Sequence, residues 1–463
     1  MAPRDPLALV PNYFGTGGFF NAKIKKVMQR TLIIDTLKKT GRTVLLKGWV
    51  NTRRDHGKIV FIDLRDRTGL IQTVLTPDLA GSLHPEDVVY ITGLVKLRPE
   101  NLVNSNLATG TVEIEAQKVE LVSQAAELPF DMGSPTLNVE LPTLLDHRTL
   151  TLRHPTVRDI FTLQAAVYEG FRQAALKLKC TEIFTPTISA SATEGGAEVF
   201  KVQYYDHSAF MVQSPQLYKQ MLVPVFERVF LTSHAYRAEP SVTTRHLSES
   251  VQMDCELGFV DFTDLLNALE FVGKNTLNYI TKTCHPILNR YNIPHPSVAK
   301  VPRLTMREAQ KIILERTGVD HTAEQDLMPE DEREICKWAL EKYDSDLVTI
   351  THFPTHKRAF YTAPDPKDPT YSLSYDLLFR GMEILSGSQR IHDQDQLVSV
   401  MKDKGLNPAN FAMYLQSFKY GMPPEGGFSF GLERLTMQFL KLGNIREASL
   451  FPRDMERVDF RLS

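Results

Sequence analysis

The chain has 463 residues, of which 42% are apolar and 23% charged. Its 53 Lys and Arg residues against 55 Asp and Glu give a formal charge of −2, which excludes a globally basic nucleic-acid-binding protein but not one with local basic patches. No apolar run reaches the roughly 18 residues of a membrane span, and the four cysteines have no paired spacing, so we expect a cytoplasmic protein with reduced thiols and two or three domains.

The first 40 residues are predicted to be an N-terminal extension. They are rich in Pro and Gly and then basic, which favours a frayed tail over an arm that touches RNA. Short β-branched runs follow at residues 44–50, 59–65, 69–75, 87–95 and 111–115, with turn residues between them. Five strands without a long helix predict a closed β-barrel of the OB type over residues 41–123, a common platform for single-stranded nucleic acid.

Three side chains of this barrel are candidates for contact with bases. Phe61 can stack on a base, while the amide of Gln72 and the carboxylate of Glu113 can bind base edges. Taken alone, these residues favour a core phenylalanine and a solvated glutamine instead. Residues 124–155 contain several prolines and little periodicity, which predicts a hinge or linker.

Residues 156–463 read as a mixed unit of strands and helices. Helical periodicity is found at residues 157–178, 265–279, 306–317 and 331–343, and strand-like runs at 209–213, 228–236, 251–260, 347–352, 371–379 and 382–386. Because few strands alternate with helices, we predict an α+β domain with a mainly antiparallel sheet. The segment 157–186, a long helix and a short strand that ends in proline, suits a subunit interface as well as an ordinary helix–strand unit.

Two arginines indicate a phosphate site. Arg237 and Glu239 point to the same face of a strand, where the guanidinium can hold a phosphate and the carboxylate can accept from an adenine amino group. Arg434 follows a glycine-rich turn at residues 426–431 and opens a helix. Asp376 and Glu383 have the chemistry to bind Mg²⁺, although surface charges are the simpler interpretation.

A second anion site is predicted from three further residues. Gln216 and Lys219 lie one helical turn apart, and Arg390 follows a Ser-Gly-Ser turn. Together Lys219 and Arg390 would form a pocket for a small carboxylate.

In chain order, the motifs match one known family. They are Glu194-Gly-Gly, Gln213-Ser-Pro-Gln-Leu-Tyr-Lys-Gln, Arg237-Ala-Glu with Arg245-His-Leu, Ile384-Leu-Ser-Gly-Ser-Gln-Arg-Ile-His, Gly431-Leu-Glu-Arg and Leu450-Phe-Pro-Arg-Asp. Over residues 42–454 the chain resembles the class II aminoacyl-tRNA synthetases, and among them the aspartyl-tRNA synthetases of the archaeal and eukaryotic type. The resemblance implies a six-stranded antiparallel catalytic sheet flanked by helices, a homodimer joined through residues 157–186, and a barrel that binds the anticodon through Phe61, Gln72 and Glu113.

The resemblance also implies a role for each site residue. Arg237 and Arg434 would be catalytic, at the α-phosphate and the γ-phosphate of ATP. The remaining ATP contacts would be Glu239 at the adenine, His246 at the γ-phosphate, Arg245, Glu383 and Gly431. Mg²⁺ would be bound by Asp376, Glu383 and Ser386. L-aspartate would be bound by Glu194, Gln216, Lys219, Asp254, Ser386 and Arg390.

The implied reaction joins L-aspartate to ATP as an adenylate and then transfers it to tRNA-Asp. An asparaginyl-tRNA synthetase is the main alternative within the family, but an amide substrate would not neutralise a buried lysine. A catalytically inactive, RNA-binding paralogue is the other alternative. Asn51 stands where some archaeal relatives carry a tryptophan linked to strict choice of tRNA-Asp, which leaves tRNA-Asn open as a second substrate. Ser250, Ser429 and Glu425 also depart from common family residues, which puts ATP affinity in question.

Overall fold

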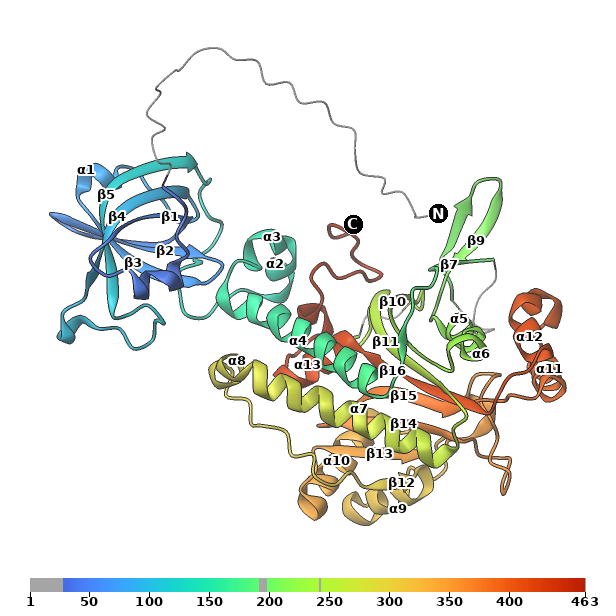
Figure 1. Cartoon of the computed structure of the whole chain (residues 1–463). Helices are drawn as coiled ribbons and strands as arrows, with labels where there is room; N and C mark the ends of the chain where they lie inside the picture. The colour runs from blue at the N-terminus through green and yellow to red at the C-terminus, as the bar shows by residue number, and fades with distance from the viewer. Residues whose placement is uncertain (1–27, 191–197, 241–242, 463) are drawn as a thin grey trace, which may run out of the picture. The chain divides into compact units, whose positions relative to one another are not determined.

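The computed structural model describes residues 28–190, 198–240 and 243–462 (Figure 1). The chain divides into two compact units, residues 1–137 and 138–463, and the prediction of an α+β protein is confirmed. No helix of the described residues is long and apolar enough to cross a membrane. The limits that we predict at residues 40, 123 and 155 stay predictions.

The first unit is a closed five-stranded barrel, as the sequence predicts. Its strands β1 (Thr43–His56), β2 (Ile59–Asp66), β3 (Gly69–Leu75), β4 (Val88–Leu97) and β5 (Val112–Ser123) pair in the order β1-β2-β3-β5-β4. The short helices η1 (Ile33–Lys38), α1 (Pro77–Ala80) and η2 (Glu100–Leu102) accompany them. Alternate strand residues such as Leu46, Ile62 and Ile91 are fully buried in the barrel core, which leaves the other face of each strand for ligands.

Short helices occupy part of the segment that we predict as a hinge. The helices α2 (Leu141–Asp146) and α3 (Arg148–Thr151) lie within residues 124–155. Arg148 is buried and donates hydrogen bonds to the backbone carbonyls of Glu447, Ser449 and Leu450 at 2.6–3.0 Å. Residues 141–151 therefore pack as part of the second unit.

An eight-stranded sheet forms the centre of the second unit. Its order is β12-β13-β14-β15-β16-β11-β10-β6, and the six strands from β13 to β10 pair with one another in antiparallel fashion, as predicted. The strands are β6 (Thr181–Glu182), β10 (Arg228–Tyr236), β11 (Glu249–Gly258), β12 (Arg303–Thr305), β13 (Leu347–Thr351), β14 (Ser374–Phe379), β15 (Met382–Gln389) and β16 (Glu425–Gly431). The edge strands β6 and β12 pair in parallel, and β7 (Ile188–Ser189), β8 (Lys201–Tyr204) and β9 (His207–Met211) form a separate small sheet.

Strand β16 replaces the glycine-rich turn expected at residues 426–431. It lies between β15 and β11 in the middle of the sheet. A Cβ on Gly427 would overlap the carboxylate of Glu256 and the carbonyl of Cys255, and one on Gly426 would overlap Leu265. These glycines are therefore needed for close packing rather than for a turn, which a search for β-branched runs does not detect.

Helices cover the sheet, and the four predicted from periodicity are confirmed as α4 (Pro155–Lys177), α7 (Phe262–Thr283), α9 (Met306–Thr317) and α10 (Pro329–Tyr343). Helices α4 and α7 lie side by side against one face (Figure 1). Phe171 of α4 is fully buried, with its ring 6.2 Å from Phe230 of β10 and 6.0 Å from Phe430 of β16. The other helices are α5 (Gln216–Met221), α6 (Val223–Phe226), α8 (His285–Arg290), α11 (Gln394–Asp403), α12 (Ala412–Lys419) and α13 (Leu432–Leu440), with η3 (Thr355–Lys357), η4 (Pro408–Phe411) and η5 (Ile445–Ala448).

Replacing Phe171 tests this core. We expect Phe171→Ala to lower the free energy of unfolding of the second unit by about 3–5 kcal/mol, because the lost ring leaves a cavity between helix and sheet. Phe460→Ala is the control, since Phe460 is 71% exposed, and a surface change should stay within about 0.5 kcal/mol. Urea unfolding followed by circular dichroism measures both. Equal midpoints for the two variants would contradict the assignment of Phe171 to the core.

Candidate active site

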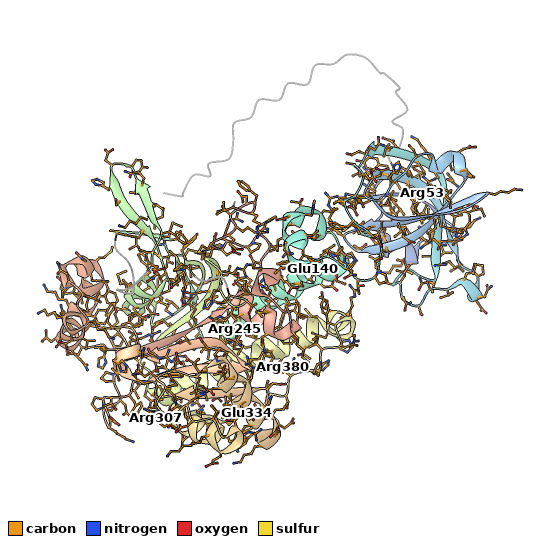
Figure 2. The ribbon with its side chains drawn as sticks, turned by 180° about the vertical axis from the view of Figure 1, so that it is seen from behind. Arg53, Glu140, Arg245, Arg307, Glu334 and Arg380 are labelled. Carbon is orange, nitrogen blue, oxygen red and sulfur yellow. The ribbon has the colours of Figure 1, made fainter. Side chains whose placement is uncertain are left out.

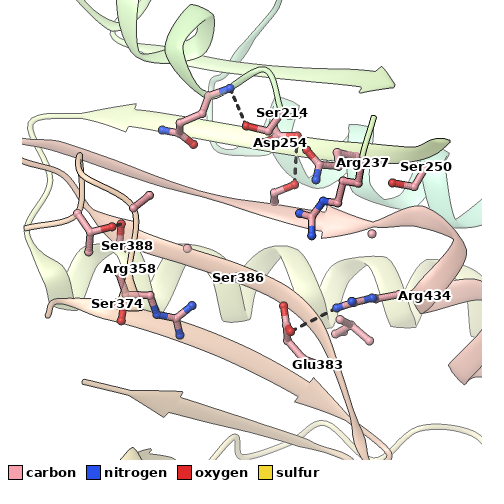
Figure 3. A pocket seen from close by; sticks show the side chains of 18 of the residues that line it. Ser214, Arg237, Ser250, Asp254, Arg358, Ser374, Glu383, Ser386, Ser388 and Arg434 are labelled. Carbon is pink, nitrogen blue, oxygen red and sulfur yellow. Dashed lines mark hydrogen bonds and ion pairs between the residues drawn. The ribbon is translucent and has the colours of Figure 1, made fainter. Parts of the chain in front are cut away.

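The face of the sheet opposite α4 and α7 holds a cavity of about 500 Å³ (Figure 3). Strands β11, β14, β15 and β16, helix α5 and the start of α13 all contribute to its wall. Most of the predicted site residues line this one cavity: Gln216, Lys219, Arg237, Arg245, His246, Asp254, Glu383, Ser386, Arg390, Gly431 and Arg434. The sequence motifs, spread over more than two hundred residues, thus meet at a single place.

Strand register explains why this face is polar. Asp254 of β11 pairs with Ser429 of β16, which pairs with Ser386 of β15, which pairs with Asp376 of β14. A second polar row, two residues along, comprises Glu256, Gly427, Ser388 and Ser374. The residues between the two rows, such as Cys255, Phe428 and Tyr375, belong to the hydrophobic core. Side chains alternate across a strand, so the same strands provide the core on one face and the site on the other.

Two buried cations lie at one end of the cavity. Lys219, on the first turn of α5, is 1% exposed, and its Nζ lies 2.8 Å from Asp254 Oδ1 and 3.0 Å from Glu256 Oε2. Arg390 is 5% exposed, and its Nε donates to Glu256 Oε1 at 2.8 Å. Glu256 thus links the two cations, which is the geometry in which buried charges are tolerated.

Burial and ion pairing act in opposite directions on this cluster. Burial disfavours the charged form of Lys219, but Asp254 and Glu256 outweigh it and raise the pKa of the ammonium. Burial likewise disfavours ionisation of Glu256, but the charges of Arg390 and Lys219 prevail and lower the pKa of its carboxyl. Lys219 and Arg390 are therefore cationic and Glu256 anionic at neutral pH.

Both cations keep hydrogen-bonding capacity for a ligand. Besides Glu256, the guanidinium of Arg390 donates to the Ser388 hydroxyl at 2.6 Å, the Gln216 amide oxygen at 3.2 Å and the Gly427 carbonyl at 3.1 Å. An arginine has five N–H groups and a lysine three. After the bonds to described residues, one N–H on Nη1 of Arg390 and one on Nζ of Lys219 are left for a bound anion.

The other end of the cavity carries more accessible cations. The side chain of Arg237 is exposed and makes no hydrogen bond or ion pair with any residue that the structure describes. Arg434 Nη1 lies 3.3 Å from Glu383 Oε2, and the two side chains point toward one another in Figure 3. Arg245, from the segment between β10 and β11 (Figure 2), pairs with Glu332 at 2.9 Å. This end suits a larger, polyanionic ligand.

His246 lies among these cations. Its Nδ1 is 2.5 Å from the hydroxyl oxygen of Thr243. Burial first, and then the positive charges of Arg434 and Arg237, lower the pKa of the imidazole. His246 is thus neutral at neutral pH, so it would bind a phosphate through a hydrogen bond rather than through charge.

Donors for Mg²⁺ are present only in part. The Glu383 carboxylate and the Ser386 hydroxyl line the cavity. Asp376 does not line it: its Oδ2 accepts from Arg358 at 2.9 Å, while its Oδ1 is buried without a hydrogen-bond partner among the described residues. In the part of the chain that the structure describes, no three His, Cys, Asp or Glu residues gather as a metal site. A Mg²⁺ ion here fits best with one carboxylate, a hydroxyl and phosphate oxygens.

Two predicted residues lie outside the cavity wall, a third lies outside the described residues, and three residues of the site were not predicted. Glu239 and Asp376 are outside it, and Glu194 lies outside the described residues. The sequence analysis missed Glu256, Arg358 and Ser388. Glu256 is two residues from Asp254 on a strand, a spacing that would have identified it as a second carboxylate on the same face.

The barrel brings together two of its three predicted residues. Gln72 of β3 donates to Glu113 of β5 at 2.9 Å, and Arg98 lies 3.4 Å from the Gln72 amide oxygen. Phe61 of β2 is half-buried, outside the barrel core, and contacts the ring of His56 edge-on. The three side chains are therefore on the outer surface of the barrel, which favours the base-binding interpretation over the core one.

Sequence comparisons identify the class of protein that this fold and cavity define. Residues 140–455 match the family described as tRNA synthetases class II (D, K and N), and residues 44–122 match the OB-fold nucleic acid binding domain. The chain therefore belongs to the class II tRNA synthetases of the D, K and N group, a family of ATP-dependent aminoacyl-tRNA synthetases.

The similar proteins include aspartate–tRNA ligases by sequence, and both aspartyl- and asparaginyl-tRNA synthetases by structure. An aspartate–tRNA(Asp/Asn) ligase of Thermus thermophilus is 40% identical over 93% of this chain and 99% of that protein, and an aspartate–tRNA(Asp) ligase of Pyrococcus abyssi is 37% identical over 90% and 96%. Among solved structures, the aspartyl-tRNA synthetase of Entamoeba histolytica matches with a TM-score of 0.83 at 28% identity over 99% of this chain and all of that one. The asparaginyl-tRNA synthetase of Pyrococcus horikoshii, bound to asparaginyl-adenylate, has a TM-score of 0.83 at 30% identity over 91% and 97%.

Removing one member of the buried charge cluster tests its geometry. We expect Lys219→Met to lower the free energy of unfolding by about 3–5 kcal/mol, because it leaves Asp254 and Glu256 buried without their cation. Adding Asp254→Asn should recover part of that loss, since one of the stranded negative charges is then removed. Urea unfolding of the single and double variants measures both effects. An unchanged stability of Lys219→Met, or no recovery in the double variant, would contradict the ion-pair account.

Proposed function

We propose that the chain is an aspartate–tRNA ligase. It activates L-aspartate with ATP and then transfers the aspartyl group to the 3′ end of tRNA-Asp. The observation that carries this proposal is the buried pair of cations, Lys219 and Arg390, at one end of a cavity whose other end holds exposed arginines. A triphosphate and a small amino acid with two carboxylates are the two ligands that such a cavity would hold together.

The buried cations favour aspartate over asparagine. In this proposal the side-chain carboxylate of aspartate accepts hydrogen bonds from the remaining N–H groups of Lys219 and Arg390. The α-amino and α-carboxylate groups of the substrate would be surrounded by Gln216, Ser386, Glu194 and the carboxylate of Asp254. An asparagine amide would bring no negative charge to this pair, and its NH₂ group would face N–H donors. Charge complementarity therefore supports aspartate as the substrate.

The chemistry needs no protein nucleophile. One oxygen of the aspartate α-carboxylate forms a bond to the α-phosphorus of ATP, the bond from that phosphorus to the β-phosphate oxygen breaks, and pyrophosphate leaves. Arg237 would bind the α-phosphate, where negative charge builds up, and Arg434, with His246 and Arg245, would bind the terminal phosphates. Glu239 would accept from the adenine amino group, and the backbone of Gly431 would lie against the nucleotide. Catalysis then rests on orientation and on placed cations.

Mg²⁺ is proposed as a companion of ATP, bound by Glu383 and Ser386 with phosphate oxygens, while the buried, unpartnered oxygen of Asp376 is the third candidate donor. When bound, it would neutralise negative charge on the phosphates. The residues of the chain would orient the triphosphate for attack.

The barrel is proposed to bind the anticodon. Phe61 would stack on a base, and Gln72 and Glu113 would bind base edges. tRNA-Asp is the proposed partner. Charging assays with transcripts of tRNA-Asp and of tRNA-Asn decide whether tRNA-Asn is a second substrate. We expect the reaction to take place in the cytoplasm, where tRNA charging supplies protein synthesis.

A homodimer is proposed through α4 and the short strands that follow it. Phe184 is 87% exposed, and Leu176 and Ile188 are 42% exposed. Large apolar side chains gathered on one exposed stretch are typical of an interface, which supports pairing of two copies through residues 157–186 and the adjoining Ile188.

Pyrophosphate exchange tests the activation step. With aspartate, the chain should exchange pyrophosphate into ATP, and asparagine should not substitute. We expect Arg237→Ala to lower the exchange rate by about 100- to 1,000-fold, because a cation at the developing charge is lost, with unfolding unchanged. Arg67→Ala, an exposed change in the barrel, is the control. Exchange with asparagine alone would favour the asparaginyl alternative, and exchange with neither amino acid would favour an inactive paralogue.

Charging of tRNA tests the barrel separately. We expect Phe61→Ala to raise the KM for tRNA-Asp by about 10-fold or more, since a stacked base is lost. Pyrophosphate exchange, which needs no tRNA in this proposal, should be unchanged. A wild-type KM for tRNA in this variant would exclude Phe61 from the anticodon site.

A further inference from the structure

One buried carboxyl group beside the cation pair has no place in the mechanism above. Glu425, the first residue of β16, is 0% exposed. Its Oε1 accepts a hydrogen bond from Nε2 of the Gln220 side chain at 2.7 Å, and Oε1 of the same side chain accepts from the Tyr414 hydroxyl at 3.0 Å. Its Oε2 has no donor among the described residues. A buried carboxylate oxygen without a donor is costly to leave ionised, so a proton on this oxygen would account for its environment.

The carboxyl of Glu256 supplies the acceptor for that proton. Glu256 of β11 and Glu425 of β16 lie on the same face of adjacent strands, two residues apart in register, and each affects the pKa of the other. Glu256 already accepts from both cations, through Oε1 from Arg390 and through Oε2 at 3.0 Å from Lys219. A second negative charge beside Glu256 in this buried site would be repelled, so of these two carboxyls Glu256, which has the cation contacts, keeps the negative charge.

The charges around Glu425 favour its neutral form. Burial, and next the charge of Glu256, raise the pKa of Glu425 well above its usual value, and Arg390 only partly opposes them. The other facing groups, Gln220 of α5 and Tyr414 of α12, are neutral. Lys219 and Arg390 contribute two positive charges, and Asp254 and Glu256 two negative ones. The cluster is thus neutral with a protonated Glu425 and carries one net negative charge with an ionised one.

We propose that Glu425 is a positioning residue of the aspartate pocket, a neutral carboxylic acid that donates a hydrogen bond to Glu256 and so keeps Arg390 and Lys219 available to the substrate carboxylate. If the chain is the aspartate ligase proposed above, on which this proposal rests, an ionised Glu425 would compete with the substrate for Arg390 and repel its carboxylate. Loss of the Glu425 proton and binding of aspartate therefore oppose each other, and by linkage the affinity for aspartate falls as pH rises through the ionisation of Glu425.

Two variants of Glu425 test whether the pocket needs a neutral hydrogen-bond donor at this position. Glu425→Gln keeps the shape, the neutral state and one N–H donor toward Glu256, so its KM for aspartate at neutral pH should stay within about twofold of wild type. Glu425→Leu removes the donor and the acceptor of Gln220, so its KM for aspartate should rise about 10-fold or more, with the KM for ATP unchanged. Glu270→Gln, the same change at a half-buried residue of α7 that pairs with Arg303 outside the cavity wall, is the control. Pyrophosphate exchange measures all four proteins.

Infrared difference spectra measure the proton directly. Wild type minus Glu425→Gln should contain the carbonyl stretch of a protonated carboxyl group at neutral pH. The ratio of wild-type to Glu425→Gln KM for aspartate should stay near one while that band persists and rise as the band is lost at higher pH.

A missing band at neutral pH, or a KM for aspartate in Glu425→Gln that differs about 10-fold from wild type while the band is present, would overturn the proposal. So would a wild-type KM for aspartate in a folded Glu425→Leu variant. Aspartate-dependent pyrophosphate exchange by the wild-type chain is measured in the same experiment. If it is present and the Glu425 results fail, only this inference is lost; if it is absent, the proposed function itself fails.

Discussion

The link from Lys219 through Glu256 to Arg390 is the interaction on which the site depends. Two cations buried to 1% and 5% exposure are sustainable only because carboxylates of the same strand, Asp254 and Glu256, lie within 3.0 Å of them. Those carboxylates are in place because β11 turns its alternate residues to the cavity while Cys255 faces the core. The hydrophobic packing of α4 and α7 on the far face thus fixes the position of the charges.

The two ends of the cavity bind anions in different ways. At one end the cations are buried and already paired, so a ligand carboxylate joins an existing network and is selected by charge and shape. At the other end Arg237 is exposed and has no partner among the described residues, so it can bind a phosphate group without breaking an existing ion pair. The buried end of the cavity therefore suits a small substrate that is selected by charge and shape, and the exposed end suits the phosphates of a nucleotide.

Local patterns predicted most of the fold but not the contacts across the sheet. Helix periodicity identified α4, α7, α9 and α10, and β-branched runs identified the barrel. Strand β16 was mistaken for a turn because its glycines reflect the close approach of Glu256 and Leu265, which are distant in sequence. Lys219 and Arg390 were predicted as an anion pocket, whereas the ion pairs of Glu256 with both cations and the engagement of Asp376 by Arg358 join residues that are distant in sequence, and they were not foreseen.

A crystal structure with a non-hydrolysable aspartyl-adenylate analogue tests the central claim most directly. The account predicts that the aspartyl carboxylate lies within hydrogen-bonding distance of both Lys219 Nζ and Arg390 Nη1, with the salt bridges to Glu256 intact and the α-phosphate beside Arg237. A carboxylate bound elsewhere in the cavity, or one that displaces Glu256 from Lys219 and Arg390, would contradict it.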